Sequence, residues 1–125
     1  MRNLVFLLAA ALCLSAEIAG GTYKGTWSGS ATGDFRIVLT PASAGAWNAD
    51  VMFTMGSDEV KTKVTSVKVD GNKLEVVYQF DLQGTRLQSA ISGELKDKLL
   101  EGSYKTTTVP DGGAVDEGTW KTSAQ

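Results

Sequence analysis

The sequence predicts an all-β protein in which eight antiparallel strands form an up-and-down meander that closes into a small barrel. From residue 22 onward, apolar residues recur at every second position, as in strands with one buried face. Short Gly-, Pro-, Asp- and Ser-containing turns separate these runs, and no run has the period of an amphipathic helix. Without helices, the sheet must cover its own apolar face by closing, or by folding into a two-sheet sandwich, which is the alternative.

The first segment of the 125-residue chain does not fit this pattern. Arg2 supplies one positive charge, and the apolar run LVFLLAAALCLSA follows. A basic start before a short apolar run is typical of a secretory signal peptide, and the run is shorter than the roughly 20 residues of a membrane span. We therefore expect residues 1–16 to be a cleaved signal peptide, cut after Ala16 or alternatively after Gly20. Residues 17–125 are expected to form a single barrel domain with no membrane span.

Composition limits the compartment and the partners. The one cysteine, Cys13, lies in the expected signal peptide, so the mature chain has no disulfide and depends on its hydrophobic core. Its 14 acidic residues and its basic residues are interspersed without a basic patch, which argues against nucleic acid as a partner. Together with the expected signal peptide, this predicts a secreted or periplasmic protein.

Alternation and turn chemistry place the strands in order. In KLEVVYQFDL (73–82), every second residue from Leu74 to Leu82 is apolar, which makes this the clearest strand. The preceding run changes parity between Val64 and Val67, so we expect a β-bulge near residues 65–66. The Asp-Gly pair in VDGNK (69–73) predicts a tight hairpin. The eight expected strands are 22–28, 33–40, 46–55, 59–69, 73–82, 85–95, 98–107 and 114–121.

Three of the expected strands carry a glycine two residues before an aromatic residue, on the same strand face. A tightly coiled sheet needs positions without side chains where it bends, and large rings to fill the adjacent space. We interpret these pairs as the seam where the first and last strands meet; the alternative is that their rings form one wall of a ligand pocket. The pairs are Gly25 and Trp27, Gly102 and Tyr104, and Gly118 and Trp120.

The same motifs support a family resemblance. The GTW at 25–27 resembles the Gly-x-Trp opening of lipocalins, and GTWSGSATGDFRIVLT is similar to the first hairpin of avidin-type barrels. Nearly the whole mature chain resembles small secreted bacterial β-domains of uncharacterised role, found alone or N-terminal to serine-hydrolase domains, through GTWSG, VTSVKVDGNKLEV, SGEL and EGTW. This resemblance implies a secreted or periplasmic bacterial β-domain without an established activity. The second lipocalin signature, an Arg over the first-strand tryptophan, is not evident, and avidin-type biotin-binding residues do not carry over.

The residues offer little for catalysis, and we expect no enzyme, metal or cofactor. The chain has no histidine, and the mature part has no cysteine, which removes the commonest nucleophile–base and zinc arrangements. Most of the available acids are expected on the face opposite the apolar one or in turns, and none is expected inside the barrel. These acids are Glu75, Asp81, Glu94, Glu101, Asp116 and Glu117.

Two functions remain open. We expect an exported interaction or structural module of the envelope or secreted space, with a filled core and a functional outer surface such as KTTT (105–108) and an envelope protein as partner. The alternative is a lipocalin-like barrel that binds a small hydrophobic ligand inside, for which a cavity of about 300 Å³ or more would argue. Its expected interior is Tyr23, Trp27, Phe35, Ile37, Trp47, Val51, Phe53, Val76, Tyr78, Phe80, Ile91, Tyr104 and Trp120. The candidate ligand-binding residues are Tyr23, Trp27, Trp47, Phe53, Tyr78, Phe80, Tyr104 and Trp120.

Overall fold

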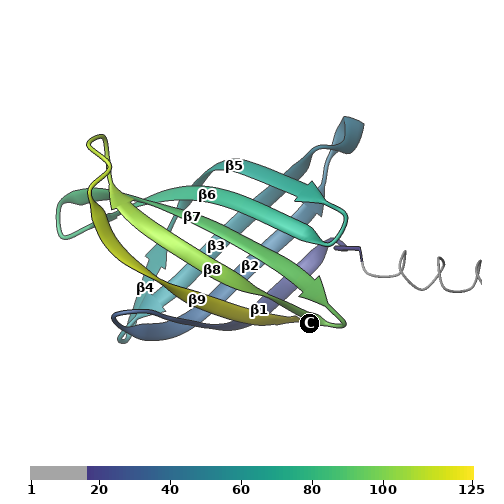
Figure 1. Ribbon diagram of the computed structural model, residues 1–125, viewed down its shortest axis with the longest axis horizontal. Coiled ribbons are helices and arrows are strands. Elements are labelled where there is room, and N and C mark those ends of the chain that lie inside the picture. The colour runs from purple at the N-terminus through teal and green to yellow at the C-terminus, as the bar shows by residue number, and fades with distance from the viewer. Residues whose placement is uncertain (1–16) are drawn as a thin grey trace, which may run out of the picture.

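The computed structural model describes residues 17–125, in which nine antiparallel strands form one sheet coiled into a nearly closed barrel (Figure 1). The strands are β1 (Gly21–Ser28), β2 (Thr32–Pro41), β3 (Trp47–Met55), β4 (Asp58–Lys61), β5 (Lys63–Asp70), β6 (Lys73–Leu82), β7 (Thr85–Lys96), β8 (Leu99–Thr108) and β9 (Ala114–Ala124), with a 3₁₀ turn, η1 (Ser43–Gly45), before β3. The expected signal peptide, residues 1–16 with Cys13, lies outside the described residues. Within residues 17–125, no helix has the length and apolar character needed to cross a bilayer.

The first and last strands pair with each other, as the sequence predicts. The strand order is β4-β3-β2-β1-β9-β8-β7-β6-β5. All neighbouring strands except β1 and β9 are therefore consecutive in the chain. In the β1–β9 ladder, Trp27 lies directly opposite Trp120. The aligned glycine–aromatic strands therefore form a seam within a single sheet, and the two-sheet sandwich does not occur.

The ninth strand arises because the expected fourth strand, 59–69, is divided at Thr62. The part before Thr62, β4, pairs with β3, and the part after it, β5, pairs with β6. The Thr62 hydroxyl donates a hydrogen bond to the carbonyl oxygen of Val51 at 2.7 Å, which holds the dividing point against β3. One bent segment thus spans the remaining gap in the barrel, and the eight-strand plan holds with one strand split.

The β-bulge in this region is also confirmed. The β5–β6 register shifts between Val64 and Ser66, which leaves Thr65 without an opposite residue. Beyond the bulge, Val67 and Val69 are partly buried against the core, as Val64 is before it. The extra residue restores the apolar side chains to one face.

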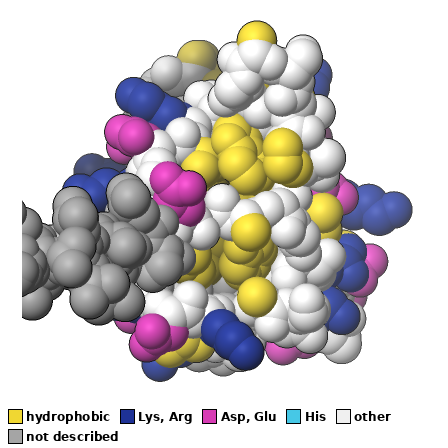
Figure 2. All heavy atoms as spheres, turned by 90° about the vertical axis from the view of Figure 1, so that its right-hand side faces the viewer, with side chains coloured by type: hydrophobic (Ala, Val, Ile, Leu, Met, Phe, Trp, Pro, Cys, Tyr) yellow, Lys and Arg dark blue, Asp and Glu magenta, His cyan; other side chains and the backbone are white. Residues whose placement is uncertain are grey.

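The two ends of the barrel differ. At the right-hand end of Figure 1, where the described chain begins and ends, the interior is closed by packed side chains. Ile18 is buried there, and its N–H donates to the carbonyl oxygen of Gly71 at 3.0 Å. Figure 2 views this end and shows hydrophobic side chains among neutral groups, with charged residues mainly around them. Other buried residues of this half are Tyr23, Leu39, Leu74, Leu95 and Leu100.

At two seam positions, glycine is required by the close approach of the neighbouring strand. Gly102 lies opposite Trp120, and Gly118 lies opposite Tyr104. A Cβ atom on Gly102 would overlap the carbonyl oxygen of Ser92, and one on Gly118 would overlap the carbonyl oxygen of Ser28. The repeated glycines let the sheet coil tightly while rings on the next strand fill the interior.

Candidate functional site

A cavity of about 120 Å³ occupies the left-hand end of the barrel in Figure 1, which we call the open end. Four strand connections surround it: β1–β2, β3–β4, β6–β7 and β8–β9. The lining residues are Trp27, Ser30, Phe35, Phe53, Met55, Tyr78, Phe80, Leu82, Leu87, Ser89, Ile91, Tyr104, Thr106, Val115, Asp116 and Trp120. Most of these side chains are apolar, so the cavity is an oily space with a few polar groups.

Aromatic rings form much of its wall. Trp27 and Phe53 meet edge to face with centroids 5.9 Å apart, and Phe53 meets Phe80 in the same way at 5.1 Å. Trp27 also contacts the ring of Tyr104 edge to face at 6.1 Å. Edge-to-face contacts of this kind fix ring orientations, so this wall is a preformed surface.

Four polar residues of the cavity lie in one line across four adjacent strands, and the other two, Ser30 and Tyr104, bond to the last of the four. Tyr78 on β6 lies opposite Ser89 on β7, Ser89 lies opposite Thr106 on β8, and Thr106 lies opposite Asp116 on β9. We call these four residues the polar row. Because side chains alternate between the two faces of a strand, residues opposite one another share a face, and all four line the cavity. The interior therefore has one polar stripe beside aromatic walls.

The middle of the polar row is deeply buried. Only 2% of Ser89 and 5% of Thr106 is exposed, and their hydroxyl oxygens are 2.6 Å apart. Two hydroxyls bring two protons, and the bond between them uses one, so one O–H is left to donate elsewhere. Burial raises the pKa of Tyr78 to about 12, and a hydrogen bond between its hydroxyl and Ser89 acts in the opposite direction with a smaller effect. Tyr78, Ser89 and Thr106 are thus neutral hydroxyls at ordinary pH, and Asp116 is the charged member of the row.

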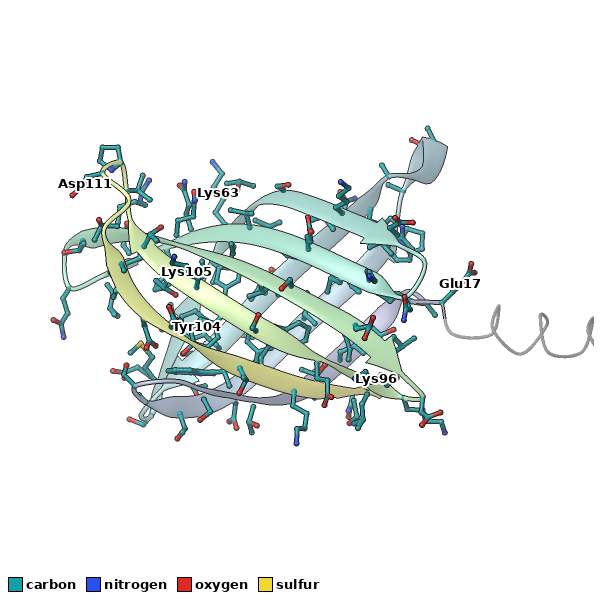
Figure 3. The ribbon with its side chains drawn as sticks, viewed as in Figure 1. Glu17, Lys63, Lys96, Tyr104, Lys105 and Asp111 are labelled. Carbon is teal, nitrogen blue, oxygen red and sulfur yellow. The ribbon has the colours of Figure 1, made fainter. Side chains whose placement is uncertain are left out.

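Asp116 ends the row at the mouth of the cavity. One carboxylate oxygen accepts a hydrogen bond from the Tyr104 hydroxyl at 2.8 Å, and the other accepts from the backbone N–H of Ser30 at 3.1 Å. Burial alone would raise the pKa of Asp116, but these hydrogen bonds, together with those from the Ser30 hydroxyl and the backbone N–H of Glu117, outweigh it and hold the pKa below its ordinary value. Burial, followed by the bond to Asp116, raises the pKa of Tyr104. The mouth therefore presents a fixed carboxylate beside a neutral phenol, and Figure 3 shows Tyr104 on β8.

A second bulge precedes Asp116. The β8–β9 register passes from Thr106 opposite Asp116 to Thr107 opposite Ala114, which leaves Val115 without a partner. Val115 is 50% exposed and lies on the rim of the cavity. Bulges commonly occur where a strand end re-aims side chains beside a site. Here the bulge adds an apolar group to the rim.

Six of the eight candidate residues predicted from the sequence come together in this cavity: Trp27, Phe53, Tyr78, Phe80, Tyr104 and Trp120. The other two do not line it. The Tyr23 hydroxyl donates to the carbonyl oxygen of Ala19 at 2.7 Å, toward the closed end. Trp47 lies at the start of β3, opposite Pro41, and is only partly buried.

Sequence reasoning missed the polar part of the site. Asp116 was expected with most of the other acids on the outer face or in turns, and that assignment is wrong because it shares the inward parity of Gly118 and Trp120. Thr106 likewise points inward, so the KTTT run is not wholly an outer surface. The signal was present: Ser89 has the same parity as Leu87 and Ile91. The alternation of inward and outward residues does not predict the cross-strand register, and it is the register that places these residues in one row.

A second, wider depression lies on the outer surface across β1, β7, β8 and β9. It is more open than the cavity, and its rim mixes lysines such as Lys96 and Lys121 with glutamates such as Glu94 and Glu101. Figure 3 shows Lys96 near the closed end. No one ligand chemistry is favoured by this mixture.

Comparison of the chain with protein-family models, with curated proteins and with solved structures found no match.

Proposed function

We propose that this protein is an exported, non-catalytic binding barrel that holds one small ring-bearing amphipathic molecule in its open end. The observation that carries the proposal is the polar row inside an otherwise apolar cavity. Buried hydroxyls carry a desolvation cost that apolar side chains avoid. Thr122 offsets this cost by bonding to a backbone carbonyl, whereas Ser89 and Thr106 bond to each other and face the cavity. A ligand with an apolar face and a polar edge matches the aromatic wall and the row together.

The size of the cavity limits the ligand. A volume of about 120 Å³ is below the roughly 300 Å³ at which typical ligand sites begin. It is comparable to an engineered cavity of about 150 Å³ that binds benzene. The fitting ligand is therefore a single ring or a short chain, with its remainder outside the mouth, rather than a large lipid enclosed in a lipocalin-like interior.

The arrangement of the row supports binding rather than catalysis. Nucleophilic catalysis needs a base beside the hydroxyl that attacks. In the row, the Ser89 hydroxyl bonds to Thr106, while Asp116 accepts its hydrogen bonds from Tyr104 and Ser30. The buried hydroxyls of Ser89 and Thr106 therefore have no carboxylate beside them as a base. Tyr104 does bond to a carboxylate, but burial and Asp116 raise its pKa, which opposes the loss of its proton.

The second candidate is the interaction module, with an envelope protein that inserts one apolar side chain into the open end. The observation in its favour is the apolar rim, where Val115 is half exposed and Met55 and Leu82 are partly buried. It predicts that small ring compounds bind no more strongly than to an unrelated protein, whereas a peptide with an apolar side chain between short spacers binds.

The experiment is a titration of the purified protein with phenol and benzyl alcohol, followed by tryptophan fluorescence and calorimetry. Trp27 and Trp120 line the cavity, so saturable binding should change the emission. Filling the cavity with Ser89→Leu should abolish the response while the far-ultraviolet circular dichroism spectrum stays that of the β-barrel. An unchanged emission and no heat at millimolar excess of both compounds would overturn the proposal.

Two isosteric threonine variants supply the matched control. Thr106→Val removes a hydroxyl of the row and should weaken phenol binding about threefold to tenfold, the worth of one neutral hydrogen bond. Thr122→Val removes an equally buried inward hydroxyl, bonded to the carbonyl oxygen of Leu100 at 2.8 Å, that does not line the cavity. It should leave the affinity unchanged. Equal effects of the two variants would show that the row does not bind the ligand.

A further inference from the structure

The open end of the barrel is strongly acidic. Its charge lies in the four connections of this end and in the three strand residues on each side of every connection. These segments hold six acidic residues and one basic residue, whereas the described chain as a whole holds 14 acidic and 11 basic residues. The acidic residues are Asp34, Asp58, Glu59, Asp81, Asp111 and Asp116, and the basic residue is Arg86. Figure 3 shows Asp111 at the tip of the β8–β9 connection at this end.

Arg86, the one basic residue within these segments, does not neutralise the mouth of the cavity, and the next basic residues, Lys61 and Lys105, lie one position outside them. Arg86 pairs with Asp81, with its Nε 2.6 Å from a carboxylate oxygen, and both side chains are largely exposed. The other ion pair among residues 17–125, Lys96 with Glu94, lies near the closed end. The remaining five carboxylates of the open end therefore act together on any charged group that approaches the mouth.

Asp116 brings this charge into the cavity wall. Its carboxylate lines the cavity, is partly buried, and takes part in neither of those ion pairs. The carboxylate accepts hydrogen bonds from the Tyr104 hydroxyl and the backbone N–H of Ser30, and the Ser30 hydroxyl and the backbone N–H of Glu117 add further hydrogen bonds that lower its pKa. These bonds hold the carboxylate in a fixed direction at the junction between the apolar interior and water. A cationic N–H donor is the partner that such a fixed carboxylate bonds most strongly.

We propose that the ligand of the open end is a cationic amine: one apolar ring inside the cavity, joined by a short chain to an ammonium group that bonds to Asp116 at the mouth. This inference rests on the binding barrel proposed above and names the class of molecule that it takes. A neutral ring compound forms no ion pair with the Asp116 carboxylate. An anionic one meets the repulsion of the surrounding carboxylates.

The test compares three ligands of nearly equal size that differ in charge: phenethylamine, phenethyl alcohol and phenylacetate. Calorimetry at neutral pH and low salt should show the amine binding about tenfold more tightly than the alcohol, as expected for a charge-assisted hydrogen bond. Phenylacetate should bind more weakly than the alcohol. The preference for the amine should shrink as the ionic strength rises from about 0.01 M to about 1 M, where screening becomes strong.

The variants locate the effect. Asp116→Asn should bring the ratio of amine to alcohol affinity close to one. Asp50→Asn, which removes an exposed carboxylate on β3 away from the mouth, should leave the ratio as in the wild type. If Asp116→Asn does not fold, the salt dependence of the wild-type ratio decides, because a preference that does not depend on charge would not respond to salt.

The outcomes separate the two proposals. Equal affinity for amine and alcohol in the wild type would overturn the cationic ligand while leaving the binding barrel in place. Binding of neither compound would overturn both. A preference that survives in Asp116→Asn and at high salt would contradict the role of the mouth carboxylate.

Discussion

At the scale of single residues, the hydroxyl pair of Ser89 and Thr106 is the feature that packing does not explain. The two oxygens satisfy each other at 2.6 Å in a wall that is otherwise mainly apolar. Removing one partner leaves the other buried without its bond, whereas removing both at once replaces the pair with apolar surface. We therefore expect the pair to make the fold less stable than two apolar side chains at these positions would, and we attribute its presence to ligand binding.

A double-mutant cycle tests this trade-off. Thr106→Val alone should lower the free energy of unfolding by about 1–2 kcal/mol because the buried Ser89 hydroxyl loses its bond to Thr106. Adding Ser89→Ala should recover most of that loss, measured by urea denaturation. If the double variant is less stable than the Thr106→Val variant by the full cost of a second independent change, the two hydroxyls do not act as a pair.

Asp116 gives the fold a pH dependence of known sign. The pKa of its carboxyl is lowered in the folded protein, against about 3.9 in an unfolded chain, so the folded state binds the proton less well. Its contribution to stability is therefore fully present above that unfolded value and is lost as the pH falls through the lowered folded pKa. The stability difference between the wild type and Asp116→Asn should be largest near about pH 6 and should shrink toward about pH 2.5. A difference that stays constant across this range would contradict the assignment.

Gly102 tests the close approach of strands at the seam. In Gly102→Ala, the new Cβ would lie 2.6 Å from Cα of Gly93 and would overlap the carbonyl oxygen of Ser92, so backbone must move. We expect a loss of about 1–3 kcal/mol or more in urea unfolding, as for other overpacked sites. Gly113→Ala is the matched control, because its Cβ would meet only the Thr108 hydroxyl at 3.3 Å in the β8–β9 connection. Equal losses in the two variants would remove the seam explanation.

At the scale of elements, the bent segment β4–β5 depends on the Thr65 bulge for its register. Deleting Thr65 would move Val67 and Val69 to the outer face, since a shift of one residue reverses every side chain that follows. The deletion should cost about 2–4 kcal/mol for two partly buried valines. Thr65→Ala should change stability little, because it removes only an exposed hydrogen bond to the carbonyl oxygen of Val77 at 3.2 Å. A deletion variant as stable as the point variant would contradict this account of the bulge.

The same segment shows which elements the sequence can predict. Alternation located every strand to within a few residues, and the parity change between Val64 and Val67 located the bulge. The division at Thr62 escaped prediction because both halves keep strand character, and only their partners differ: β3 before it and β6 after it. The local sequence of a strand does not indicate that its first half pairs with one neighbour and its second half with another.

At the scale of the whole molecule, the barrel has a packed end and an open, acidic end. The barrel and its seam were predictable because periodicity and short turns allow few topologies for eight sequential strands. The aromatic wall was predictable in part, since large rings with inward parity must share the interior. The polar row was not, because cross-strand register aligns Tyr78, Ser89, Thr106 and Asp116 from positions far apart in the chain.

The most direct measurement of the central claim is a nuclear magnetic resonance titration of the isotope-labelled protein with phenethylamine. The account predicts saturable shift changes concentrated at Ser89, Thr106, Asp116 and the indole N–H of Trp27, which donates to the carbonyl oxygen of Thr54 at 3.0 Å at the open end. Resonances of Tyr23 and Trp47, which do not line the cavity, should stay in place. Shifts confined to the outer depression across β1, β7, β8 and β9, or no shifts at saturating ligand, would contradict it.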